Sequence, residues 1–161
     1  MPVIVPITEP ELTTARSAWG VGLVKIAEAH ETGGIESART VASRMLDELY
    51  GYQLGPVLFK PTMASGHQTF RPTKQGALSY FVGHDPEYRF DNGFGLNQWQ
   101  SVQSETAASF IHGDVALWMG HVMITNKKGQ ITTVDKSFGY TKDANGVLRI
   151  VLHHSSLPYQ P

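Results

Sequence analysis

The sequence predicts an α+β fold in which helices pack on one face of an antiparallel sheet. Two observations support this class: helical apolar periodicity dominates the first half of the chain, and alternating β-rich runs fill the second half. Separation of helices from strands along the chain favours this architecture over a parallel α/β sheet. No repeat or linker interrupts the sequence, so we expect one domain over residues 1–161.

The N-terminal half is expected to form two long helices. The first begins after Thr8, which has capping-box spacing to Glu11. Apolar residues then recur at helical intervals, namely Leu12, Ala15, Trp19, Leu23, Ile26 and Ala27. The pair Gly33–Gly34 is expected to end this helix, and a second helix should run over about 35–50, stopped by Gly51.

The remaining elements follow from proline positions and from alternation. An extended segment over 55–62 lies between two prolines, and a shorter helix is expected over about 72–82. The predicted strands are 94–102, 107–111, 115–125, 132–141 and 147–155. Turn-forming sequences separate these runs, and Asn145-Gly146 is the strongest hairpin signal among them.

Composition excludes several classes of function. The 13 Lys+Arg nearly balance the 14 Asp+Glu, so charge indicates neither a nucleic-acid partner nor a membrane surface. The chain has no cysteine, which excludes disulfides, thiolate metal sites and thiol nucleophiles. No apolar run reaches membrane-spanning length, and the proline-broken residues 1–8 do not resemble a signal peptide. We therefore expect a cytoplasmic protein, unless a leader was removed from the chain.

Seven histidines raise the question of a metal site. They are His30, His67, His84, His112, His121, His153 and His154. None of these pairs has the i, i+4 spacing of a helical zinc site, and no strand carries His-x-His. His121 lies within a predicted strand and is expected to be a core histidine. We expect no metal, although distant segments could still assemble a site.

The last predicted strand ends in four polar residues. Strand alternation sorts them into two pairs on opposite faces, His153 with Ser155 and His154 with Ser156. Two further hydroxyls complete an uncharged constellation: Thr62 and Tyr80. An imidazole with hydroxyls can hold a small oxyanion and transfer a proton near neutral pH. The same groups can also have only a structural role, as polar side chains that hydrogen-bond one another at the edge of the core.

Five segments in this order resemble the iota-class carbonic anhydrases, which are related to the association domain of calmodulin-dependent kinase. The segments are LGPVLFKPT (54–62), SYFVG (79–83), GFGLNQW (93–99), FGY (138–140) and LRIVLHHSSLP (148–158). The resemblance covers roughly residues 19–159. It implies a cone-shaped fold of the nuclear-transport-factor-like type, in which a curved antiparallel sheet wraps a long helix and encloses a pocket. It also implies a homodimer.

The resemblance implies reversible hydration of CO₂ to bicarbonate, a hydro-lyase reaction. The family's pocket groups map onto Thr62, Tyr80, His153 and Ser155, with His154 and Ser156 as the alternative pair if the strand phase is reversed. Apolar walls are expected from Phe59, Phe81 and Trp99. In a metal-free mechanism His153 would take a proton from water while the hydroxyls orient it. Members of the family differ in metal dependence, so manganese or zinc stays open as a cofactor.

Two other functions stay open on the same fold. One is an isomerase or cyclase acting on a larger ring substrate, which needs a buried carboxylate base; Asp114 and Asp135 are the candidates within strands. The other is a non-catalytic assembly or anion-binding domain, like the kinase-association relatives.

Overall fold

The computed structural model describes residues 3–161, and it begins with a long helix, α1, over Glu9–Leu49. Thr8 caps this helix: its hydroxyl accepts from the Glu11 N–H at 3.3 Å, and the Glu11 carboxylate accepts from the Thr8 N–H at 2.8 Å. Gly34 interrupts α1 with φ 75° and ψ −167°, a conformation that glycine adopts without a Cβ penalty. α1 is therefore two helices joined at a kink, and the predicted helix boundary at Gly33–Gly34 is confirmed.

Five strands form one sheet in the order β1-β5-β4-β3-β2. They are β1 (Leu58–Lys60), β2 (Trp99–His112), β3 (Val115–Asn126), β4 (Ile131–Lys142) and β5 (Leu148–Ser156). β2 to β5 pair antiparallel, whereas β1 pairs parallel with β5. The expectation of a purely antiparallel sheet is therefore wrong. The parallel edge comes from pairing between segments far apart in the chain, which no local pattern reveals.

β2 is longer and more bent than the sequence predicts. The runs predicted as 94–102 and 107–111 are replaced by a short 3-10 helix over Phe94–Leu96 and one continuous strand over Trp99–His112. Two register shifts interrupt its pairing with β3, one between Trp99 and Ser101 and one between Thr106 and Ala108. Such bulges bend a strand without ending it, so the polar sequence at the bend does not separate two strands.

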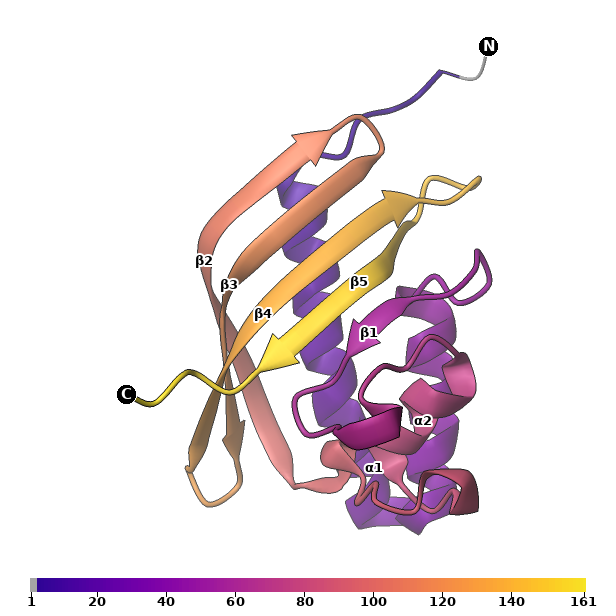
Figure 1. Ribbon diagram of the computed structural model, residues 1–161, viewed down its shortest axis with the longest axis vertical. Helices are drawn as coiled ribbons and strands as arrows, with labels where there is room; N and C mark the ends of the chain where they lie inside the picture. The colour runs from indigo at the N-terminus through magenta and orange to yellow at the C-terminus, as the bar shows by residue number, and fades with distance from the viewer. Residues whose placement is uncertain (1–2) are drawn as a thin grey trace.

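α1 packs against one face of the sheet, and no helix of residues 3–161 covers the opposite face (Figure 1). The second helix, α2 (Lys74–Val82), lies beside β1 and against α1. The aromatic core lies between α1 and the inner sheet face and includes Trp19, Phe59 and Phe138. None of the helices described here has the length and apolar character that a membrane span requires.

Candidate active site

A small cavity opens within this core, between α1, α2 and the inner faces of β4 and β5. Its lining residues are Trp19, Phe59, Pro61, Thr62, Tyr80, Phe81, Phe94, Lys136, His153 and Ser155. Its volume of about 10 Å³ is close to the minimum for one water molecule. Thr62 and Phe94 are the half-buried members of the lining. A larger molecule therefore enters only if side chains such as these shift outward.

Three hydroxyls converge on the cavity from three different elements. The Thr62 and Ser155 hydroxyl oxygens lie 2.6 Å apart, within hydrogen-bond distance. The Tyr80 hydroxyl, carried by α2, accepts from the Met63 N–H at 3.3 Å. Burial raises the pKa of Tyr80 to about 12, so this phenol keeps its proton at neutral pH. The three groups can therefore donate hydrogen bonds to an oxyanion.

The structure decides which pair of the last strand faces inward. His153 and Ser155 are each only 1% exposed, whereas His154 is exposed and Ser156 is half-buried on the outer face. The Ser155 carbonyl accepts from Lys60 Nζ at 2.9 Å, which ties β5 to β1 at this point. The alternative pair, His154 and Ser156, therefore does not line the cavity.

The His153 ring is enclosed by aromatic rings and engaged at both nitrogens. Its ring centroid lies 4.6 Å from that of Phe59 and 4.5 Å from that of Phe138. Nδ1 is 2.8 Å from the Tyr50 hydroxyl, and Nε2 is 2.7 Å from Lys136 Nζ. Burial lowers the pKa of His153 well below its usual value. The imidazole is therefore uncharged at neutral pH.

Lys136 is the polar cavity residue that the sequence analysis did not identify; Trp19, Pro61 and Phe94 are the further lining residues that it did not name as part of the site. It lies on β4 opposite Ser155, is 4% exposed, and its Nζ lies 4.5 Å from the Trp19 ring centroid. Burial, and then the charge of Lys60, lower its pKa to about 7. One signal was available in the sequence: Lys136 alternates in phase with Val134 and Phe138, on the apolar face of the predicted strand.

Trp99, which was expected to form an apolar wall, lies outside the cavity. Trp99 packs behind the lining residue Phe94, with ring centroids 5.2 Å apart, and its Nε1–H donates to the Phe94 carbonyl at 2.7 Å. Trp99 is therefore a supporting core residue rather than a wall, whereas Phe59 and Phe81 do line the cavity.

Neither candidate carboxylate points into the cavity. Asp135 lies on the outer sheet face, where its Oδ1 is 2.9 Å from His121 Nδ1. Asp114 lies in the turn between β2 and β3 rather than in a strand. The side chain of His121 is 56% exposed, so its prediction as a core histidine is wrong. The isomerase alternative therefore lacks its required inward carboxylate base.

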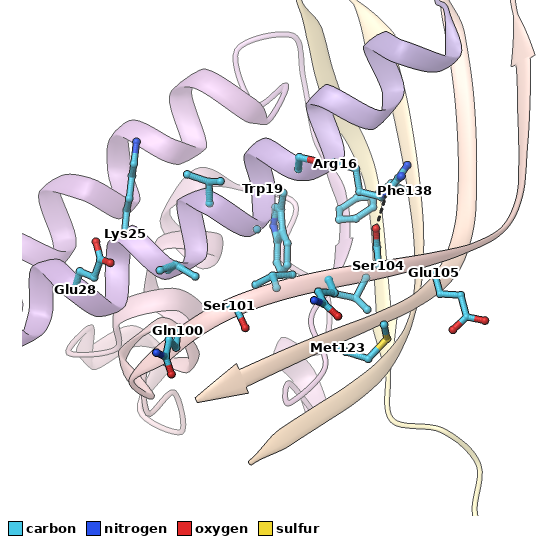
Figure 2. A pocket seen from close by; sticks show the side chains of 17 residues that line it. Arg16, Trp19, Lys25, Glu28, Gln100, Ser101, Ser104, Glu105, Met123 and Phe138 are labelled. Atoms are coloured by element: carbon cyan, nitrogen blue, oxygen red, sulfur yellow. Dashed lines mark hydrogen bonds between the residues drawn. The ribbon is translucent and has the colours of Figure 1, made fainter. Parts of the chain in front are cut away.

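A larger groove of about 880 Å³ lies between α1 and β2 (Figure 2). Trp19 lines both the groove and the enclosed cavity, so its ring forms a shared wall. The groove carries both basic and acidic side chains, and Arg16 Nε donates to Ser104 Oγ across it at 2.9 Å. No imidazole lines it, so the hydroxyl–imidazole chemistry belongs to the smaller cavity.

Within residues 3–161, no three His, Asp or Glu side chains are grouped closely enough to hold a metal ion. Of the cavity's nitrogen groups, His153 Nε2 faces an amine and its Nδ1 faces a phenol. The polar groups of this cavity are therefore hydroxyls, one imidazole and one amine.

A bent sheet wrapped around a long helix is the arrangement of the nuclear-transport-factor-2-like class. An NTF2-like protein from Pseudomonas putida aligns with a TM-score of 0.55 at 12% identity, over 94% of this chain and 87% of its own. A calcium/calmodulin-dependent kinase II association domain from Xanthomonas campestris aligns over the full length of both chains, with a TM-score of 0.61 at 17% identity. These two likenesses establish the fold.

Closer relatives define the family. The family model "Metal-independent carbonic anhydrase" matches residues 10–157. A metal-independent carbonic anhydrase of Nostoc sp. PCC 7120 is 51% identical over 154 residues, covering 96% of this chain and 75% of the relative. A cyanobacterial iota-carbonic anhydrase crystallised with bicarbonate has a TM-score of 0.97 at 49% identity, over 100% of this chain and 99% of its own. The chain belongs to the metal-independent carbonic anhydrases of the iota class.

Proposed function

We propose that this carbonic anhydrase hydrates CO₂ in the cavity formed by Thr62, Tyr80, His153 and Ser155. The observation that carries this assignment is the pair of hydroxyl oxygens 2.6 Å apart, Thr62 and Ser155, inside an otherwise aromatic enclosure. Polar groups in such an enclosure are costly unless they bind each other or a ligand. A cavity with apolar walls and converging hydroxyls suits a small apolar substrate and an oxyanion product.

The hydroxyls hold the oxygens of water and bicarbonate. Phe59 and Phe81 exclude bulk water, which strengthens each hydrogen bond made inside the cavity. Preorganised donors aimed at a developing oxyanion typically contribute a factor of about 10²–10³ each. Support comes from the cyanobacterial structure at 49% identity, which contains bicarbonate. We infer that bicarbonate binds this chain among Thr62, Tyr80 and Ser155.

His153 supplies an uncharged imidazole beside these hydroxyls. Both of its nitrogens have buried partners, and its pKa lies well below the usual value, so the ring stays uncharged at neutral pH. His153 therefore acts in this mechanism as a member of a hydrogen-bonded chain rather than as an isolated base.

The first test is stopped-flow CO₂ hydration on protein treated exhaustively with chelator, with the metal content assayed on the same sample. Activity without detectable metal is expected. Absence of hydration activity both with and without added divalent ions would instead favour an assembly or anion-binding role.

The second test assigns the site. Thr62→Val and Ser155→Ala should each lower kcat/KM by about 10²–10³-fold, because each removes one oxyanion donor. Ser137→Ala is the matched control, since it removes a hydroxyl from the outer face of the same sheet. Unchanged kinetics in both cavity variants would contradict the site assignment.

We also propose a homodimer formed through the outer sheet face. A row of register partners crosses all five strands there: Phe110, Leu117, Gly139, Leu152 and Leu58. Three of these side chains are at least 45% exposed, an apolar band uncommon on the free surface of a monomer. Leu117→Glu should shift the sedimentation coefficient from dimer to monomer, and an unchanged coefficient would refute this interface.

A further inference from the structure

Four buried groups form one hydrogen-bonded chain behind the hydroxyls. Trp19 Nε1–H donates to the Tyr50 hydroxyl oxygen at 2.9 Å. The same hydroxyl lies 2.8 Å from His153 Nδ1, and His153 Nε2 lies 2.7 Å from Lys136 Nζ. Trp19, Tyr50 and His153 are each at most 2% exposed, and Lys136 is 4% exposed. The chain thus begins at an indole deep in the core and ends at an amine that lines the cavity.

The hydrogen-bond donors of Trp19 and Tyr50 indicate in which direction the protons point along this hydrogen-bonded series. An indole N–H can only donate, so Tyr50 accepts from Trp19. The Tyr50 proton then has His153 Nδ1 as its acceptor, and a buried hydroxyl rarely forgoes such a partner. With that direction the neutral imidazole carries its proton on Nε2, facing Lys136. An ammonium group has no lone pair to accept that proton, so this tautomer requires Lys136 to be an uncharged amine.

The surroundings of Lys136 favour the same protonation state. The titratable groups facing it are Lys60 from β1 and His153 from β5, and α1 contributes the Trp19 face. Among residues 3–161, no carboxylate forms an ion pair with Lys136. Burial without a counterion lowers the pKa to about 7, so a large fraction of Lys136 is uncharged at physiological pH.

We propose that uncharged Lys136 is the catalytic base of the hydration reaction, with Tyr50 and His153 as positioning residues. This inference rests on the proposed function, because it places the reaction beside Ser155, the register partner of Lys136. The oxygen of a bound water forms a bond to the CO₂ carbon, and one C=O electron pair moves to oxygen. The His153 Nε2–H···Nζ hydrogen bond breaks, which frees the Nζ lone pair. The water O–H bond breaks, and its proton forms a bond to Lys136 Nζ.

The products of that step fit the cavity. The new ammonium and the His153 Nε2–H both become donors to the bicarbonate anion, which leaves with one negative charge. The ammonium proton then passes to water or buffer, which restores the amine. A base with a pKa near the working pH combines a substantial reactive fraction with a useful driving force, as general-base catalysis requires.

The first experiment measures the wild-type protein and needs no variant to fold. The ¹⁵N chemical shifts of labelled histidine distinguish which ring nitrogen carries the proton. At about pH 8.5, above the pKa of about 7 for Lys136, the His153 proton is expected on Nε2. A proton on Nδ1 under these conditions would mean that Nε2 accepts from Lys136, and it would overturn the hydrogen-bond direction on which the proposal rests.

The second experiment separates proton acceptance from positive charge. Lys136→Met has no base and Lys136→Arg keeps a permanent charge, so both should lower kcat by about 10²–10⁴-fold and lose the inflection near pH 7. Exposed Lys128→Met is the matched control and should retain both kcat and the pH profile. Retention of activity by Lys136→Arg would show that Lys136 contributes charge alone, which would overturn the proposal.

The outcomes also separate the two proposals. An active wild type with impaired Thr62 and Ser155 variants, but an unchanged pH profile in Lys136→Met, would refute the base assignment and leave the site intact. An inactive wild type would refute both.

Discussion

Replacement of Lys136 by methionine should change how the stability of this protein depends on pH. Lys136 is buried without a carboxylate partner, and its pKa falls from 10.5 to about 7 in the folded state. Between these two values the unfolded chain binds a proton that the folded chain does not bind. Unfolding therefore takes up a proton in this window, and the free energy of unfolding rises with pH.

The magnitude follows from the pKa difference. Each unit corresponds to about 1.4 kcal/mol, so the shift from 10.5 to about 7 corresponds to roughly 5 kcal/mol of unfavourable burial at pH 7. Methionine fills a similar volume without a charge. It also leaves the His153 Nε2–H without a partner, which costs about 1–3 kcal/mol. The variant should therefore be about 2–4 kcal/mol more stable than wild type at pH 7.

The assay is urea unfolding of wild type and Lys136→Met at one protein concentration, at several pH values between about 6 and 9.5. The difference between the two proteins cancels the contribution of titrating groups that do not contact Lys136, and His153, which does, is uncharged in the folded protein throughout this pH range. It should be constant below about pH 7 and should then change by about 1.4 kcal/mol per pH unit in favour of wild type.

Parallel stability curves above pH 7 would refute the reasoning, because they would mean that Lys136 has the same pKa in the folded and unfolded chains. Lys128→Met is the control for loss of a lysine charge, since Lys128 is exposed, and its curve should remain parallel to wild type.

Three further substitutions test the supports of the site and the fold. Tyr50→Phe should lower the free energy of unfolding by about 1–3 kcal/mol, since it leaves the buried His153 Nδ1 and Trp19 Nε1–H without a partner; an unchanged urea midpoint would show that these two hydrogen bonds do not stabilise the fold. Asp91→Ala should cost about 3–5 kcal/mol by leaving the charge of buried Arg71 unpaired, and a smaller loss by calorimetry would show that solvent reaches that pair. Thr8→Ala should cost about 1 kcal/mol through loss of the helix cap, and equal melting temperatures would show that the cap contributes nothing.

Local patterns in the sequence determined most of the secondary structure. The capping box at Thr8, the glycine break at Gly34 and the hairpin at Asn145-Gly146 all depend on residues within a few positions of one another. The alternation of β3 and β4 is equally local. Such features can be predicted from the sequence because the interactions that produce them join residues close together along the chain.

The candidate site was predicted in part, through its resemblance to a family rather than through spacing. The sequence identified Thr62, Tyr80 and the two His/Ser pairs. Strand alternation alone did not show which of the two pairs faces the core. The register of β5 against β1 and β4 decides that His153 and Ser155 face the core.

Only the tertiary structure brought Lys136 to His153 and gave the lysine its chemistry. The two residues come from different strands, and the loss of solvent that lowers the pKa of Lys136 is produced by rings from α1, β1 and β4 together. A lysine in the unfolded chain has an ordinary pKa because water surrounds its amine. Burial is a property of the assembled core, so the sequence by itself determined where a lysine stands and the fold determined whether it can act as a base.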